Sequence, residues 1–123
     1  HDTDNNNVGA GAIVTAEVDA DGDNPTIAGA DMVVLTDATY DTLAEVLTAI
    51  STGGDSAFTT ATAVAANGGI LLGFEDSDGD FNIAVTSHGG NNATSDDIDG
   101  LAQIVELSGL SANDALSADF DTI

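Results

Sequence analysis

The sequence predicts an α+β or mainly β fold: an antiparallel sheet, built as a β-meander, with one main helix packed on a face. Three features predict it. The first half of the chain contains an apolar stripe at helical spacing. The second half contains two apolar segments joined by an Asp-Gly turn, and a third apolar segment follows them. The 123 residues fit a single acidic domain, expected at residues 8–123 after a flexible N-terminal segment, residues 1–7.

Short apolar segments predict the elements before the helix. Residues 8–18 (VGAGAIVTAEV) are small, apolar and partly β-branched, which favours a strand. Residues 19–25 (DADGDNP) then break this strand, because nearly every position carries a turn residue. Residues 32–35 (MVVL) predict a short buried strand.

The main helix is expected over residues 37–51. Its apolar stripe has a 3-4-3 spacing, with Val46 beside it, and consists of Tyr40, Leu43, Leu47 and Ile50. Asp37 or Thr39 is expected to cap its start, and Asp41 suits the positive end of the helix dipole. The Ala- and Thr-rich residues 58–66 predict a shorter, weaker helix.

The meander occupies the second half of the chain. Residues 70–75 and 81–86 flank Asp78-Gly79, and glycine accepts the positive φ that tight hairpin turns require. After a polar loop, residues 101–107 (LAQIVEL) fit a third strand. The remaining residues predict turns and one helical turn before the terminal ADFDTI.

The charge of the chain is extreme. It has 22 acidic residues, 18 of them Asp, and no Lys or Arg, so its formal net charge is −22. No Lys or Arg salt bridge can relieve the repulsion, so stability must come from apolar packing, backbone hydrogen bonds, and bound cations or high ionic strength. Nucleic acid and anionic membranes are excluded as partners because both require basic residues. Cysteine is absent, which excludes disulfides and thiolate metal sites.

Two acidic turns are candidate calcium sites. Asp76, Asp78 and Asp80 alternate around Gly79, and Ser77, backbone carbonyls and water would complete the shell. The spacing is not that of an EF-hand, and a solvated Asp-Gly hairpin is the competing interpretation. The second turn contains Asp19, Asp21 and Asp23, with Glu17 before it and Asp31 after it as further ligands. An acidic turn without metal is the competing interpretation here too.

The order of elements resembles the C-terminal regions of hemolysin-type (RTX) bacterial proteins. The resemblance covers roughly residues 30–121 and is carried by five segments: ADMVVLTDATYDTLAEVLTAI, a Gly/Thr/Ala stretch, GGILLGFEDSDGDFNIAVTS, LAQIVELSGL and ALSADF. It implies type I secretion, an extracellular setting rich in calcium, and a surface, adhesive or matrix role. The family's nonapeptide GGxGxDxUx (U, a large apolar residue) is missing. Residues 89–97 (GGNNATSDD) match it only loosely.

These observations predict a non-enzymatic structural protein. We expect an extracellular, calcium-stabilised subunit of a bacterial surface layer, filament or matrix that assembles with itself, with residues 8–18 as a strand added to a neighbouring copy. The alternative is a C-terminal secretion and calcium-folding module of a larger exoenzyme or adhesin. A third interpretation, a copper site at His1 with His88, conflicts with the polar surroundings of His1 and the lack of Trp and Cys. The sequon Asn92-Ala93-Thr94 permits glycosylation.

Overall fold

The computed structural model describes residues 15–28, 30–51, 53–64, 68–88, 92–94 and 98–117. The strands that these residues form are β1 (Thr15–Asp19), β2 (Thr26–Ile27), β3 (Met32–Thr39), β4 (Thr59–Val64), β5 (Leu71–Glu75), β6 (Phe81–His88), β7 (Asn92–Thr94) and β8 (Ile98–Leu107). The helices are α1 (Leu43–Ile50) and α2 (Ala112–Ser117). No described helix is long and apolar enough to cross a membrane.

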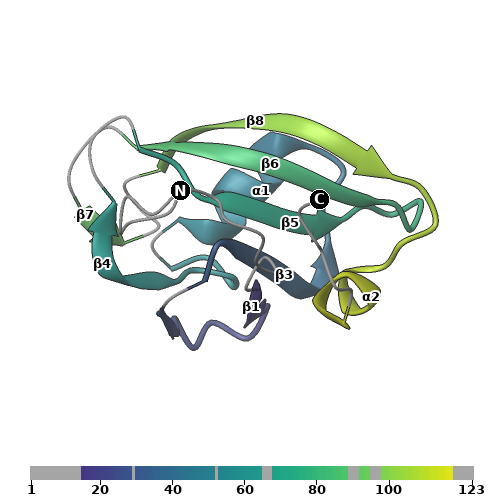
Figure 1. Cartoon of the computed structure of the whole chain (residues 1–123). Coiled ribbons are helices and arrows are strands. Elements are labelled where there is room, and N and C mark those ends of the chain that lie inside the picture. The colour runs from purple at the N-terminus through teal and green to yellow at the C-terminus, as the bar shows by residue number, and fades with distance from the viewer. Residues whose placement is uncertain are drawn as a thin grey trace.

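The main sheet has five strands in the order β1-β3-β5-β6-β8 (Figure 1). Strands β1, β3 and β5 are parallel, whereas β5, β6 and β8 form the antiparallel meander. The α+β, mainly β fold class and its one main helix are confirmed, but the sheet as a whole is mixed. A smaller sheet consists of β2, β4 and β7.

Alternation along the strands separates two apolar clusters, one on each face of the main sheet. Helix α1 packs on the first face, where Val33, Leu35 and Leu72 lie in one cluster with Val46 and Ile50 of the helix. The second face carries a smaller cluster of Met32, Val34, Phe81 and Ala112, the last from α2. Figure 1 shows α1 behind the sheet and α2 beside the end of β3. The first cluster is the main core.

Helix α1 is shorter than predicted. It begins at Leu43, and Thr42 is its N-cap: the Thr42 hydroxyl accepts the Glu45 N–H, and the Glu45 carboxylate accepts the Thr42 N–H. The predicted caps, Asp37 and Thr39, are wrong because both residues belong to β3. β3 bulges between Val34 and Thr39, and Asp37 adopts a φ of 62° there.

The weaker helix predicted over residues 58–66 is wrong. Residues 59–64 form β4, which pairs in parallel with β2 and antiparallel with β7. The segment TTATAV contains three β-branched threonines and a valine, which favour a strand once partner strands are available. Phe58, just before β4, is buried in the main core.

The meander is confirmed. The two hairpin strands lie where the apolar segments predict them, although β6 continues to His88. The third strand begins at Ile98, so residues 98–100 of the predicted loop are extended. In the predicted N-terminal strand, Thr15–Val18 are extended and pair with β3, while residues 1–14 lie outside the described residues. Helix α2 confirms the predicted helical turn.

Candidate functional site

The hairpin end of the molecule contains the first predicted calcium site. Asp76 follows β5, and its Oδ1 accepts the N–H groups of Asp78 and Asp80 at 3.1 and 3.0 Å. Its Oδ2 accepts the Asn82 amide at 3.0 Å. Gly79, with a φ of 81°, donates its N–H to the Asp76 carbonyl, which confirms the Asp-Gly turn. These hydrogen bonds lower the pKa of Asp76 from its usual 3.8, led by the backbone contact with Asp80.

Two further aspartates tie this turn to neighbouring segments. Asp80 accepts the Gly109 N–H at 3.0 Å and the Ser108 hydroxyl at 3.3 Å, both from the turn after β8. Asp41, just before α1, accepts the Ser77 N–H at 2.9 Å, and its contacts with Ser77 lower the pKa of its carboxyl group. The acids at this end therefore act as acceptors for N–H and O–H groups, and they link three segments of the chain.

A small polar cavity lies beside the turn. It has a volume of about 90 Å³, and the polar residues around it are Asp41, Thr42, Asp76, Asn82, Gln103 and Glu106. Asn82 is only 3% exposed, and its Oδ1 accepts the Gln103 amide at 2.6 Å. Oxygen-rich surroundings of this kind suit water or a hard cation.

The residues of the second predicted calcium site lie in two separate places. Glu17 and Asp19 point to the same face of β1, where each lies within reach of the Thr36 hydroxyl, at 3.1 and 2.8 Å. Asp21 and Asp23 instead lie in the exposed turn that follows, where Asp21 Oδ1 accepts the Asp23 N–H at 3.0 Å. No pattern in the sequence points to Thr36, which is 2% exposed and directly bridges the two carboxylates.

The two turns differ in how well they fit calcium. Within the described ranges, no three His, Cys, Asp or Glu side chains are grouped so that they could hold a metal ion. Both oxygens of Asp76 are engaged by N–H donors, which leaves little room for a cation at Asp76, Asp78 and Asp80. The pair Glu17 and Asp19 fits better, because two carboxylates meet one hydroxyl that has a single proton to donate.

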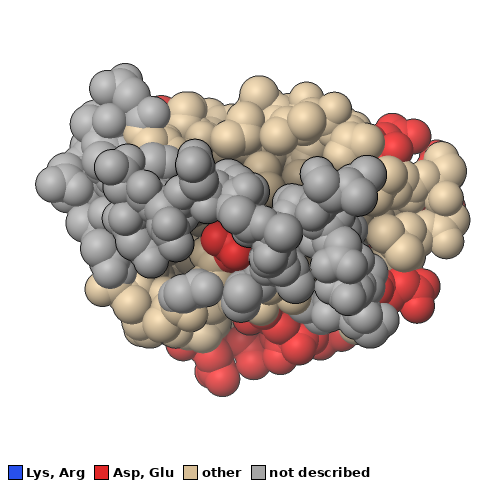
Figure 2. Space-filling model, in the orientation of Figure 1, with Lys and Arg blue, Asp and Glu red and all other residues tan. Residues whose placement is uncertain are grey.

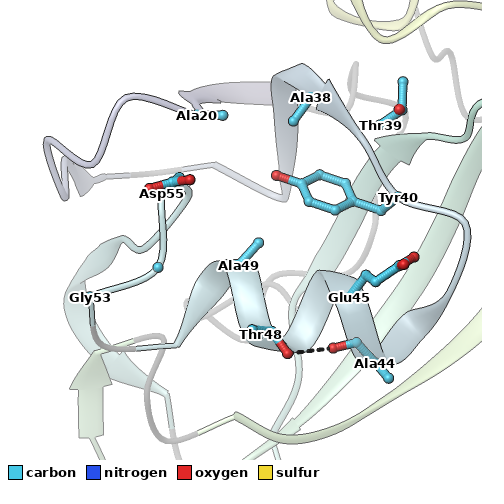
Figure 3. A pocket seen from close by; sticks show the side chains of 11 residues that line it. Ala20, Ala38, Thr39, Tyr40, Ala44, Glu45, Thr48, Ala49, Gly53 and Asp55 are labelled. Atoms are coloured by element: carbon cyan, nitrogen blue, oxygen red, sulfur yellow. Dashed lines mark hydrogen bonds between the residues drawn. The ribbon is translucent and has the colours of Figure 1, made fainter.

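A hollow of about 600 Å³ lies between α1 and the end of β3 (Figure 3). Its walls are mostly small residues, including Ala20, Ala38, Ala44 and Ala49, and the ring of Tyr40 projects into it. Glu45 at its rim is engaged in the helix cap. Apart from the Asp55 carboxylate, the hollow therefore offers few polar groups that could fix a ligand.

The residues of the copper interpretation are only partly described. His88 ends β6 and is 4% exposed. Its Nε2 lies 3.0 Å from the Thr86 hydroxyl. His1 lies outside the described residues.

Comparisons with known proteins identify no relative of this chain. No family model, curated protein sequence or solved structure matches the chain. The resemblance to the hemolysin-type proteins stays a prediction.

Proposed function

We propose that the chain is an extracellular structural protein, a calcium-stabilised subunit of a bacterial surface layer, filament or matrix. One observation carries the cation requirement: Glu17 and Asp19 meet at the Thr36 hydroxyl in a chain that has no Lys or Arg. The extracellular and bacterial setting is supported by the resemblance to type I-secreted proteins.

The Thr36 contact cannot satisfy both carboxylates at once. A hydroxyl has one proton, so it donates to Glu17 or to Asp19, and the other carboxylate then faces an oxygen lone pair. Glu17 and Asp19 are both exposed, but two anions that share one hydroxyl still repel each other, and no Lys or Arg exists in the sequence to compensate them. A divalent cation with oxygen ligands removes this repulsion. Calcium fits such a flexible site better than magnesium, which demands near-octahedral geometry.

Cation binding would also favour assembly. Figure 2 shows acidic side chains gathered along the lower margin of the molecule, below β1. Two copies with a formal charge of −22 each repel one another, and bound calcium lowers that repulsion. Addition of residues 8–18 to a neighbouring sheet remains part of the proposal. Because Thr15–Val18 pair with β3 of their own chain, it requires β1 to be exchanged between copies.

A thermal melt tests the cation requirement. The chain is melted in EDTA, in millimolar calcium and in millimolar magnesium, all at matched ionic strength. Calcium at a hundredfold excess over Kd should raise the free energy of unfolding by about 2.7 kcal/mol, and magnesium should raise it less. Equal melting in EDTA and in calcium contradicts the proposal.

Two double variants test which carboxylates are responsible for the stabilisation by calcium. E17Q/D19N removes the carboxylate pair at Thr36, whereas D21N/D23N removes the same charge from the exposed turn. The first variant should lose most of the calcium-dependent shift in Tm, and the second should keep it. Electron microscopy in calcium then tests assembly: regular polymers support a structural subunit, and a calcium-stabilised monomer instead indicates a secretion and folding module.

A further inference from the structure

The large exposed apolar side chains of the described residues lie close together on two adjacent strands. Three large apolar residues are exposed, Val85 at 36%, Ile104 at 60% and Val105 at 37%, and all three lie on the adjacent strands β6 and β8. Val85 pairs with Ala102, and Val105 pairs with Ile83, so these four side chains share the sheet face opposite α1. Ile104, the extra residue of the bulge between Gln103 and Val105, lies next to them in β8. We call Ile83, Val85, Ala102, Ile104 and Val105 the apolar strip.

The apolar strip is also free of acidic residues. Residues 81–88 and 100–105 contain no Asp or Glu, although acids make up 22 of the 123 residues. In Figure 2 the upper margin, where β8 runs, is tan for most of its length, whereas red gathers along the lower margin. Grouped exposed apolar side chains on an otherwise polar surface are typical of an interaction site.

We propose that the apolar strip is the contact surface between two copies of this chain. The distribution of charge favours a second copy over a basic partner. A basic partner is attracted to the acidic surface around β1 and not to a strip that lacks acids. For a second copy, this strip is where two strongly acidic molecules can approach with the least repulsion. The inference deepens the proposed function, on which it rests for the claim that copies of the chain assemble.

The contact is face to face rather than an extension of the sheet. β8 is an edge strand, but its pairing with β6 shifts register at Ile104 and again at Asp99, so it carries two bulges. Bulges on an edge strand disturb the regular ladder that a further strand needs. The apolar side chains therefore meet those of the second copy across the sheet face, in the manner of two packed sheets. Residues 8–18 are not needed for this contact.

Cysteine crosslinking tests the geometry directly, because the chain has no cysteine of its own. A two-fold contact centred on the apolar strip brings Val105 close to Val105 of the other copy, so a Val105→Cys variant should form covalent dimers under mild oxidation. Asp78→Cys, placed on the exposed hairpin turn, is the matched control and should stay monomeric. The experiment is run in EDTA with about 1 M NaCl, which shortens the screening length to about 3 Å. Equal dimer yields from the two variants overturn the inference.

Sedimentation equilibrium in the same buffer measures the affinity. The triple variant V85T/I104T/V105T keeps β-branched side chains but removes the apolar surface, and it should weaken self-association at least tenfold. A28T/A44T/A61T changes three exposed residues elsewhere and should associate like the wild type. A wild type that stays monomeric, or a strip variant that associates equally well, contradicts the inference. Since no calcium is present, failure here is distinct from failure of the calcium melt.

A deletion separates this surface from strand exchange. Removal of residues 1–14 leaves the apolar strip intact, so self-association in high salt should persist. Loss of association in the deletion variant, together with normal association in the strip variant, would assign the contact to the N-terminal segment and overturn the inference.

Discussion

The Asp80 carboxylate accepts the backbone N–H of Gly109 at 3.0 Å, and so ties the β5–β6 turn to the turn that follows β8. The Ser108 hydroxyl reaches the other oxygen of the same carboxylate at 3.3 Å. In most proteins a carboxylate at such a position could pair with a lysine or arginine. Here backbone N–H and hydroxyl groups take the place of the missing cations, which explains why short Asp side chains fit these turns.

Removal of the Asp80 carboxylate should therefore destabilise the fold. In Asp80→Ala, both donors of the β8 turn lose their acceptor, and we expect a loss of about 1–2 kcal/mol in the free energy of unfolding. Asp78→Ala is the control, because Asp78 is exposed in the same turn, and its effect should stay within about 0.5 kcal/mol. Urea unfolding followed by circular dichroism measures both. Similar losses in the two variants would show that the Asp80 contacts add nothing beyond what the neighbouring aspartate of the same turn contributes.

The contribution of Asp76 should depend on pH. Its pKa is lowered in the folded state from a usual value of 3.8, so its stabilising contribution is present above about pH 4 and is lost as pH falls through the folded pKa. In Asp76→Asn the new amide group must face the amide of Asn82, and the variant should be less stable at pH 6. The difference from the wild type should shrink below pH 3.8. Urea titrations at constant high ionic strength measure it, and a difference independent of pH refutes the assignment.

The sequence predicted the antiparallel half of the sheet because its signals are local. Two apolar segments around Asp78-Gly79 fix both the turn and the pairing of β5 with β6. The parallel half depends on pairing between β1, β3 and β5, which lie far apart in the chain, and no turn specifies that register. For the same reason the contact of Thr36 with Glu17 and Asp19 could not be predicted, although all three residues are visible in the sequence.

The start of α1 is marked in the sequence by a capping pattern and not by the spacing of its apolar residues. Thr42 and Glu45 form the T-x-x-E pattern of a capping box, which marks the observed start. The apolar spacing alone places Tyr40 in the helical stripe. It lies before the helix instead, buried with its ring at 6.5 Å from that of Phe74. The bulge at Asp37 has no local signature, because aspartate tolerates a positive φ but does not require one.

Gly73 should tolerate no side chain. A Cβ at this position would lie 2.3 Å from Cζ of Phe81, whose ring is fully buried against the β5 backbone. Gly73→Ala should therefore destabilise the protein by about 1–3 kcal/mol, as overpacking of a core does. The double variant G73A/F81L should recover part of the loss, since a smaller side chain leaves room for the new methyl group. Purely additive losses in urea unfolding would show that the two positions do not interact.

The buried hydroxyl groups of Tyr40 and Ser56 should be coupled in their contributions to stability. Their oxygens lie 2.9 Å apart, and Ser56 has no exposed surface. Tyr40→Phe leaves the serine hydroxyl without this partner and should cost about 1–2 kcal/mol, and Ser56→Ala should cost a similar amount. The double variant replaces both hydroxyls by apolar groups, so it should cost less than the two single losses together, with a coupling of at least about 0.5 kcal/mol. Tyr40 is the only tyrosine and there is no tryptophan, so the fluorescence of Ser56→Ala reports on this site alone. Additive losses with unchanged tyrosine emission would show that the contact does not stabilise the fold.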